Sequence, residues 1–432
     1  VLSGDVYISR NDGVGGFGVT STLAESPIDM NVLWVGTDDG NLQVSRDQGK
    51  SWTEVSRNVP GVPDGTYVSR VAASVRSRGT AYATFDGHRD GDFSPYAYKT
   101  TDFGATWTPI NAGLPEGSVS VIVEHPDSAD VLFLGTEHSA WVSTTAGAQW
   151  TKMQNVPTTS YDDMLIHRRE KDLVMGTHGR GIWILDDSRF FGEWGAAQSA
   201  PAHLFPMDNG TMFRYRKDNS YRAQADFAGV NPVDGVEMTY RLGPGDGPAE
   251  LQISRDGIVI RRMSVPGGAG LHRVNWDLRH GDQDQPDVWA RFDDPDYPRS
   301  PNQSGGVWVS PGLFTVTLKA RGVESAKTLE VVGDPLLDLT TADYQATERF
   351  LLRAAALADR ARAVAQAPGI TEDEAARRSA LAQAVQALAR GFGDGGRFGD
   401  GNFGPPTSEQ ISRLNELAEE IDAVSPPNGA GG

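Results

Sequence analysis

Short apolar runs closed by turn residues recur along the first 190 residues of the chain. The runs are Val32–Thr37, Ala81–Phe85, Val131–Thr136 and Leu173–Thr177, and three of them end in Gly-Thr. A run of four to eight apolar residues bounded by turn signals is typical of a buried strand. The pattern therefore predicts a β-rich region built from repeated short strands.

A turn sequence with the pattern S/T-x-D-x-G-x-x-W, called the box here, follows three of these strands. Its first residue recurs after 55 and then 43 residues, close to the period of a β-propeller blade. An Asp can accept backbone N–H groups across the turn, a Gly can take positive φ, and a Trp can pack between blades. We therefore interpret the box residues as structural, with each Trp buried between blades: Ser45, Asp47, Gly49 and Trp52; Thr100, Asp102, Gly104 and Trp107; Ser143, Gly147 and Trp150, with Thr145 in place of the third Asp.

The repeats predict three four-stranded blades, at residues 17–57, 67–110 and 118–154. A fourth blade, 160–187, ends at Trp183–Asp187 without a box or a fourth strand. Residues Gly4–Gly13 resemble the tail of an earlier blade. Because an unfinished blade exposes unpaired backbone, we expect residues 1–192 to be the C-terminal part of a larger propeller rather than a closed ring. Missing N-terminal blades or another chain would then contact it.

The boxes and their surroundings resemble a known family. The segments TDDGNLQVSRDQGKSW, SPYAYKTTDFGATW and DLVMGTHGRGIWILDD are similar to the last propeller of bacterial sortilin-like BNR/Asp-box repeat proteins, some of which are named glycosyl hydrolases by similarity to sialidases and xyloglucanases. The resemblance implies a secreted, periplasmic or cell-surface protein. The box indicates the fold but not the chemistry, because it occurs in hydrolases, sorting receptors and lectin-like proteins alike.

The second half of the chain changes pattern twice. Residues 193–203 are small and polar, and are predicted to be a linker. Alternating apolar and polar residues over 204–333 predict an immunoglobulin-like β-sandwich, and GLHRVNWDLR followed by SPGLFTVTLKARG resembles the immunoglobulin-like domain that follows such propellers. Helical periodicity over 334–424 predicts three helices, interrupted by a Gly-rich loop at 391–404, and the tail 425–432 is predicted to be disordered. The predicted fold class is mainly β, with a partial propeller, a sandwich and a C-terminal helical segment.

Charge and composition narrow the possible partners. The chain has 39 Lys and Arg against 57 Asp and Glu, a formal net charge of −18, and no cysteine. This balance argues against nucleic acid and anionic membranes as partners, and no apolar run is long enough to span a membrane. Without Cys, disulfides and thiolate metal sites are excluded.

Chemistry-bearing residues gather in the turns between the second and third strands of the predicted blades. In antiparallel blades these turns lie on one face, opposite the boxes. We call this set the B–C rim: Asp38 and Asp39; the long loop with Asp86, His88, Arg89, Asp92 and Tyr96; Glu137 and His138; His178 and Arg180. Length beyond a tight turn often serves contact, so the rim is predicted to bind a protein, a peptide or a glycan.

Three functions remain open from the sequence. The first is a binding or scaffold protein that uses the rim, and the second is a fragment of a BNR-repeat glycoside hydrolase with acid and base carboxylates on facing blades. The third is a structural subunit of a larger extracellular assembly. The chain has no G-x-S-x-G elbow or H-E-x-x-H metal motif, and Arg89 and Arg180 alone cannot form the arginine triad of sialidases. No catalytic residue, cofactor or metal is assigned, although Ca²⁺ at Asp394 and Asp400 or in the Asp-rich loop 282–296 is considered.

Overall fold

The computed structural model describes residues 18–213, 235–281, 283–284, 306–390, 392 and 402–424. The chain divides into two compact units, Val1–Gln198 and Ser199–Gly432, which are described separately. The structure confirms a mainly β chain with a partial β-propeller and a C-terminal helical segment. The expectations for Gly4–Gly13, for 425–432, and for most of 282–296 and 391–404 fall outside the described residues.

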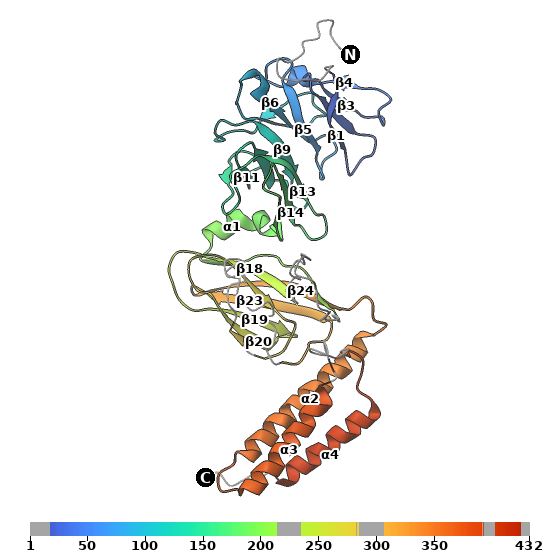
Figure 1. The fold of residues 1–432 in the computed structure, drawn as a ribbon, viewed down its shortest axis with the longest axis vertical. Helices are drawn as coiled ribbons and strands as arrows, with labels where there is room; N and C mark the ends of the chain where they lie inside the picture. The colour runs from blue at the N-terminus through green and yellow to red at the C-terminus, as the bar shows by residue number, and fades with distance from the viewer. Residues whose placement is uncertain are drawn as a thin grey trace. The chain divides into compact units, whose positions relative to one another are not determined.

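Residues 18–198 of the first unit form four consecutive antiparallel sheets, each with strands in chain order (Figure 1). Within this described range, blades 1 to 3 have four strands each, and blade 4 has three. The strands are β1 Thr20–Glu25, β2 Leu33–Thr37, β3 Leu42–Ser45 and β4 Thr53–Glu54; β5 Tyr67–Ala73, β6 Ala81–Asp86, β7 Tyr96–Thr100 and β8 Thr108–Pro109; β9 Val119–Glu124, β10 Leu132–Thr136, β11 Ala140–Ser143 and β12 Thr151–Lys152; β13 Tyr161–Ile166, β14 Leu173–Thr177 and β15 Ile182–Leu185. The inner strands β1, β5, β9 and β13 contact one another in that order.

Hydrogen bonds inside each box shape the turn between the third and fourth strands. Asp47 Oδ1 accepts the backbone N–H of Ser51 at 2.9 Å, and Asp47 Oδ2 accepts the Ser51 hydroxyl at 2.6 Å. These bonds, the hydroxyl bond first, lower the pKa of Asp47 to about 2. Asp102 makes the same pair of bonds to Thr106. In the third box the hydroxyl of Thr145 accepts the backbone N–H of Gln149 at 2.9 Å. Thr145 therefore makes the same backbone bond across the turn as the Asp of the other boxes, although its side chain is shorter.

The box also joins each blade to the blade before it. Trp107 packs edge-on against Trp34 of blade 1, with ring centroids 6.0 Å apart, and Trp150 Nε1 donates to the carbonyl of Ile110 at the end of blade 2. Gly147 has a φ of +90°, and a Cβ there would lie 2.7 Å from the Ile110 Cβ, so both the turn and the close approach require glycine.

The expected burial of all three box tryptophans is wrong for Trp52. Trp107 and Trp150 are buried, but Trp52 is 39% exposed, and its indole N–H bonds the Gly49 carbonyl of its own turn. The physical reason lies in the order of the blades. Each buried Trp packs on the preceding blade, and no described blade precedes the one that carries Trp52.

Segment 193–203, expected to be a linker, contains regular structure. A 3₁₀ helix, η3 Ser188–Glu193, leads into α1 Trp194–Ser199, and β16 begins at Ala202. Phe191 packs edge-on against Phe133 of β10 with centroids 5.3 Å apart. Phe191, which lies just before this segment, therefore covers part of blade 3.

The second unit begins with two packed sheets. A three-stranded sheet has the order β16-β18-β21, and a six-stranded sheet has the order β17-β24-β23-β19-β20-β22. Trp276 of β21 meets Phe314 of β23 with centroids 5.2 Å apart, so the core lies between the sheets. The strands are β16 Ala202–Leu204, β17 Gly210–Met212, β18 Val236–Leu242, β19 Ala249–Arg255, β20 Ile258–Val265, β21 Gly270–Trp276, β22 Gln283–Asp284, β23 Gly312–Ala320 and β24 Val323–Gly333. A β-sandwich is thus present, and its immunoglobulin-like type stays a prediction.

The described residues after the sandwich form three helices: α2 Thr341–Ala365, α3 Glu372–Ala389 and α4 Ser408–Val424. Capping boxes start the first two, with Thr340 bonding Asp343 and Thr371 bonding Glu374. Glu348 of α2 is buried against the sandwich, where Arg255 Nη2 lies 2.7 Å and His280 Nε2 lies 2.6 Å from its Oε1. The helices are therefore tied to the sandwich by a buried polar cluster as well as by apolar packing.

One buried histidine, His125, is expected to make the stability of the propeller depend on pH. His125 follows β9 and is almost fully buried; its Nδ1 accepts the backbone N–H of Asp127 at 3.1 Å, and its Nε2 has no partner among the described residues. Burial lowers the pKa of His125 to about 4. The unfolded chain takes up this proton near pH 6.5 but the folded chain only near pH 4, so stability falls as the pH drops from 6.5 to 4, by at most about 3 kcal/mol.

We expect His125→Asn to flatten the stability profile between pH 6.5 and 4, because Asn keeps an acceptor for Asp127 but does not titrate. Urea denaturation of the intact chain, followed at several pH values, measures this slope. His167 occupies the same turn in blade 4 but is exposed, so His167→Asn is the matched control and should leave the slope unchanged. Equal slopes in the wild-type chain and His125→Asn would contradict this assignment.

Candidate functional site

The turns of the B–C rim lie beside the starts of the inner strands. Backbone N–H groups of Asp38, Glu137 and His178 donate to the carbonyls of Val19, Ser118 and Ser160, at 3.0, 3.1 and 2.9 Å. Each bond joins a turn to the beginning of the inner strand of the same blade. The first residues of the inner strands therefore lie next to the turns of the rim. We call these first residues the inner layer of the rim.

The blade 1 turn uses both carboxylates within the protein. Asp38 Oδ1 accepts the backbone N–H groups of Gly18 and Val19, both at 2.8 Å. Asp39 accepts the hydroxyl of Thr37 and the side-chain amide of Asn41. Partial burial acts to raise the pKa of Asp39, but these hydrogen bonds outweigh it and hold the pKa below its usual range. The turn is thus a rigid, anionic edge of the rim.

The long loop of blade 2 is folded on itself rather than open. Residues His88–Asp90 form a short 3₁₀ helix, and His88 Nδ1 lies 2.6 Å from Asp86 Oδ2. The guanidinium carbon of Arg89 lies 5.1 Å from the centre of the Tyr67 ring, and the Phe93 carbonyl accepts the backbone N–H of Gly117 at 2.7 Å. These contacts fix the loop to its own blade and to the link that enters blade 3.

The exposed ring of this loop is Phe93 rather than Tyr96. Tyr96 is buried, and its hydroxyl donates to Asp92 Oδ2 at 2.7 Å. This bond, with that of Ser94, keeps the pKa of Asp92 below its usual range. Tyr96 therefore positions Asp92 through this hydrogen bond, and its buried ring cannot stack on a ligand. Phe93 is 45% exposed and is the aromatic surface that the loop offers.

The turns of blades 3 and 4 carry exposed imidazoles. Glu137 Oε1 accepts the backbone N–H of Ser118 at 3.3 Å, and His138 Nε2 lies 3.8 Å from the same oxygen. His178 Nδ1 lies 3.2 Å from Asp162 Oδ2, and the Arg180 carbonyl accepts the indole N–H of Trp183 at 3.0 Å. The rim here presents polar groups that can both donate and accept hydrogen bonds.

Sequence reasoning missed a repeated bulge in the inner strands. The pairing of the first two strands shifts by one residue at the same place in every blade, at Ser21, Ser69, Ser120 and Asp162. Ser21 and Ser69 each donate to a carbonyl of the next inner strand, Val68 at 2.8 Å and Val119 at 2.6 Å. Asp162 holds the corresponding position in blade 4. An ionised carboxylate accepts hydrogen bonds but cannot donate them, so Asp162 cannot make the bond that these serines make.

Asp163, the residue after Asp162, forms an ion pair that links blade 4 to blade 2. Asp163 Oδ1 lies 2.8 Å from Arg70 Nη2, which reaches from β5 past β9 to β13. Both side chains are partly exposed, so the pair is worth at most about 1 kcal/mol. Aligning the segments TSTL, VSRV, VSVI and YDDM would have revealed both Asp162 and Asp163.

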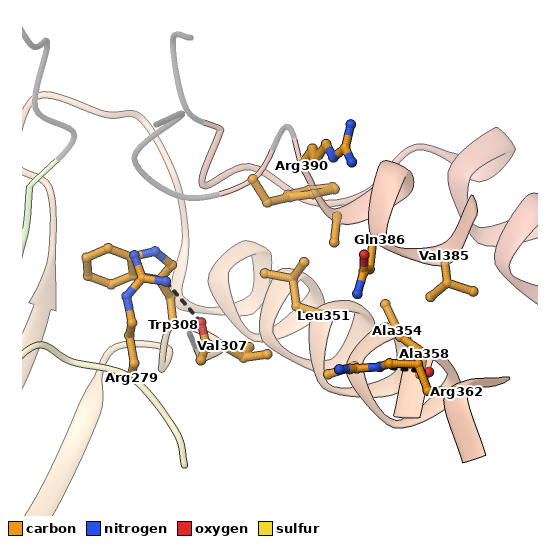
Figure 2. A pocket seen from close by; sticks show the side chains of 14 residues that line it. Arg279, Val307, Trp308, Leu351, Ala354, Ala358, Arg362, Val385, Gln386 and Arg390 are labelled. Carbon is orange, nitrogen blue, oxygen red and sulfur yellow. Dashed lines mark hydrogen bonds between the residues drawn. The ribbon is translucent and has the colours of Figure 1, made fainter. Parts of the chain in front are cut away.

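The second unit contains a cavity of about 380 Å³ (Figure 2). It lies between α2, α3 and residues 306–308, and most of its lining is apolar. Arg279, Arg362 and Arg390 line its edges, and Arg279 stacks on Trp308 with 4.2 Å between the guanidinium carbon and the ring centre. Among the described residues that line it, none carries a carboxylate.

Two carboxyls of the rim, Asp39 and Asp92, are poorly suited to act as a general acid. A general acid needs a carboxyl whose pKa is raised toward neutrality, but Asp39 and Asp92 have lowered pKa values.

Within the described residues, no group of three or more His, Asp or Glu side chains is placed to hold a metal ion. Among the described helices, none has the length and apolar character that a membrane crossing requires.

The chain is similar in sequence to proteins named xyloglucanases. The chain is 24% identical over 345 residues to a xyloglucanase of Paenibacillus sp., a match that covers 64% of this chain and 33% of the enzyme. It is 24% identical over 276 residues to an oligoxyloglucan-reducing end-specific xyloglucanase of Emericella nidulans, covering 61% of this chain and 29% of the enzyme. The chain thus spans about a third of the length of these curated relatives. No family model matches it.

Two solved structures match this chain at low structural similarity. The GH74 xyloglucanase of Xanthomonas campestris matches with a TM-score of 0.32 and 14% identity, covering 71% of this chain and 49% of the enzyme. The GH74 enzyme of Niastella koreensis matches with a TM-score of 0.33 and 17% identity, covering 39% of this chain and 29% of the enzyme.

Proposed function

We propose that this chain binds a neutral polysaccharide of the xyloglucan class through the B–C rim, as part of a secreted BNR-repeat protein of the glycoside hydrolase type. The observation that carries the proposal is the similarity to two xyloglucanases over more than half of the chain. The rim adds chemical support, because Phe93 offers an apolar ring to a sugar face, while His138, His178 and Arg180 offer hydrogen bonds.

Charge favours a neutral ligand over an anionic one. The chain has a formal net charge of −18, and the rim itself contains Asp38, Asp39, Asp86 and Glu137. Such a surface repels polyanions at low salt. A neutral sugar chain meets no such barrier, and its hydroxyls can donate to the carboxylates and accept from the imidazoles and Arg180.

We expect Phe93→Ala to weaken the binding of xyloglucan oligosaccharides about tenfold, the equivalent of about 1.4 kcal/mol. Isothermal titration of the intact chain with xyloglucan, galactomannan and polygalacturonate oligosaccharides measures the affinity and the class of sugar. Phe213→Ala is the matched control, because Phe213 is similarly exposed but lies in the second unit. A peptide ligand in place of a sugar, or a Phe93→Ala variant that binds as tightly as the wild type, would reject the proposal.

Hydrolysis is the second candidate function, and the names of the relatives favour it. Among the described residues of the propeller, Asp162 is a carboxylate placed for a chemical role. It is exposed at the inner layer of the rim, interacts with His178, and replaces the serine of the other blades. If the chain cleaves xyloglucan, Asp162→Asn should abolish the release of new reducing ends while retaining binding. Equal release by wild type and variant would exclude Asp162 from catalysis.

A further inference from the structure

Each of the three histidines of the B–C rim lies beside a carboxylate. The pairs are His88 Nδ1 with Asp86 Oδ2 at 2.6 Å, His178 Nδ1 with Asp162 Oδ2 at 3.2 Å, and His138 Nε2 with Glu137 Oε1 at 3.8 Å. The three imidazole side chains are 49%, 82% and 68% exposed, in the same order, so a ligand can reach all of them. We call these three the rim pairs.

The rim pairs recur on three consecutive blades but are built in three different ways. In blade 2 the carboxylate ends β6, in blade 3 it belongs to the residue before the histidine, and in blade 4 it comes from the inner strand β13. His125 and His167, in the turns after β9 and β13, use Nδ1 to accept a backbone N–H at 3.1 Å instead. The pairing therefore distinguishes the rim histidines from these two, and no shared sequence motif imposes it.

The carboxylates decide which imidazole nitrogen changes its role with pH. An ionised carboxylate can only accept, so the Nδ1 atoms of His88 and His178 carry a proton whether the ring is neutral or charged. Their Nε2 atoms then accept a hydrogen bond when the ring is neutral and donate one when it is charged. An unperturbed imidazole makes this change between about pH 5 and 8. Acidification thus turns acceptors of the rim into donors.

The net charge of the rim changes at the same time. The other charged groups around the pairs are Arg89 and Asp90 next to His88, Arg180 in the turn of His178, and Arg70 and Asp163 next to Asp162. Guanidinium groups stay charged, and ordinary carboxyls titrate near pH 4, so between pH 8 and pH 5.5 the imidazoles are the groups that change. Each rim pair loses its net negative charge over this range, and the repulsion of an anion decreases.

We propose that the B–C rim binds sugars that carry a carboxylate, the uronic acids, at acidic pH and excludes them at neutral pH. A sugar carboxylate is still ionised at pH 5.5 and can only accept hydrogen bonds, so it needs donors and positive charge. His178 and Arg180, both exposed in one turn, supply a donor that depends on pH and a permanent cation.

A neutral sugar responds differently to the same change. Its hydroxyls both donate and accept, so they can bond an imidazole in either charge state. The rim therefore selects between the two sugar classes by pH. This inference rests on the proposed function in one respect, that the rim is the sugar-binding surface.

Isothermal titration of the intact chain at constant ionic strength tests the inference. The probes are an oligogalacturonate, in which every sugar carries a carboxylate, and a neutral xyloglucan oligosaccharide. From pH 8 to pH 5.5 we expect the affinity for oligogalacturonate to rise at least about tenfold, because charge-assisted hydrogen bonds replace repulsion, and the affinity for xyloglucan to change less than about threefold.

A variant that keeps each contact but does not titrate separates the rim from the overall charge of the chain. The triple variant His88→Asn, His138→Gln and His178→Asn places an amide N–H where each imidazole faces its carboxylate. We expect this variant to bind oligogalacturonate equally at pH 8 and pH 5.5. His167→Asn is the matched control, because it removes an exposed histidine outside the rim and should keep the wild-type rise.

The outcomes separate this inference from the proposed function. An affinity for oligogalacturonate that does not rise in the wild type, or that rises equally in the triple variant, would overturn the inference even where xyloglucan binds. A rise that the triple variant loses, in a chain that does not bind xyloglucan, would support the inference and reject the proposed neutral ligand. Circular dichroism at both pH values establishes that each variant is folded.

Discussion

Replacing Trp107 by alanine is expected to lower the free energy of unfolding of the propeller by about 3–5 kcal/mol, whereas Trp52→Ala should cost less than about 1 kcal/mol. Both residues hold the same position of the box. Trp107 is buried in the apolar cluster between blades 1 and 2, in contact with Trp34, while Trp52 is 39% exposed. The pair therefore separates the effect of burial from the effect of the turn sequence.

Chemical denaturation of the wild type and the two variants measures the difference. The fluorescence of the remaining tryptophans reports unfolding of the propeller. Trp150→Ala should behave like Trp107→Ala, because Trp150 is buried against blade 2. Similar losses of stability for Trp52→Ala and Trp107→Ala would show that the box acts locally and does not join the blades.

Glu348→Gln is expected to cost the second unit about 3–5 kcal/mol, because it leaves Arg255 beside a neutral group at a buried site. Burial alone acts to raise the pKa of Glu348, but the hydrogen bonds from His280, Arg255 and Ser310 outweigh it and lower the pKa to about 2. The folded pKa lies below the unfolded value of about 4.5, so this contribution is present above pH 4.5 and is lost as the pH falls toward 2.

Thermal unfolding of the intact chain at pH 7 and at pH 3 measures this effect. Glu348→Gln should lower the melting temperature of the second unit at pH 7, and the difference from the wild type should shrink at pH 3. Glu324→Gln is the matched control, because Glu324 makes an exposed ion pair with Lys319 and should change stability by less than about 1 kcal/mol. A Glu348→Gln variant as stable as Glu324→Gln at pH 7 would contradict this role.

The blades could be predicted from the sequence because each blade repeats the same local signals. The box residues and the apolar strands are properties of short segments, and the structure has these strands in the predicted places. The helix starts at Thr340 and Thr371 depend in the same way on a few neighbouring residues, so the sequence predicts them as well.

The features that sequence reasoning missed depend on partners far away in the chain. Trp52 fits the box pattern, but its burial requires a neighbouring blade on one side. Tyr96 fits a rim of exposed aromatic residues, but its ring lies in the core and its hydroxyl supports Asp92. Glu348 gains its partners from two distant segments of the sandwich, Arg255 and His280, and no short motif marks that meeting.

Hydrogen–deuterium exchange of the intact chain, with and without a saturating xyloglucan oligosaccharide, tests the central claim most directly. The account predicts slower exchange at residues 86–94 and 176–181, where the long loop and the blade 4 turn form the rim, and unchanged exchange in α2 and α3 around the cavity. Protection of α2 and α3 without protection of the rim, or no protection at all under saturating sugar, would contradict it.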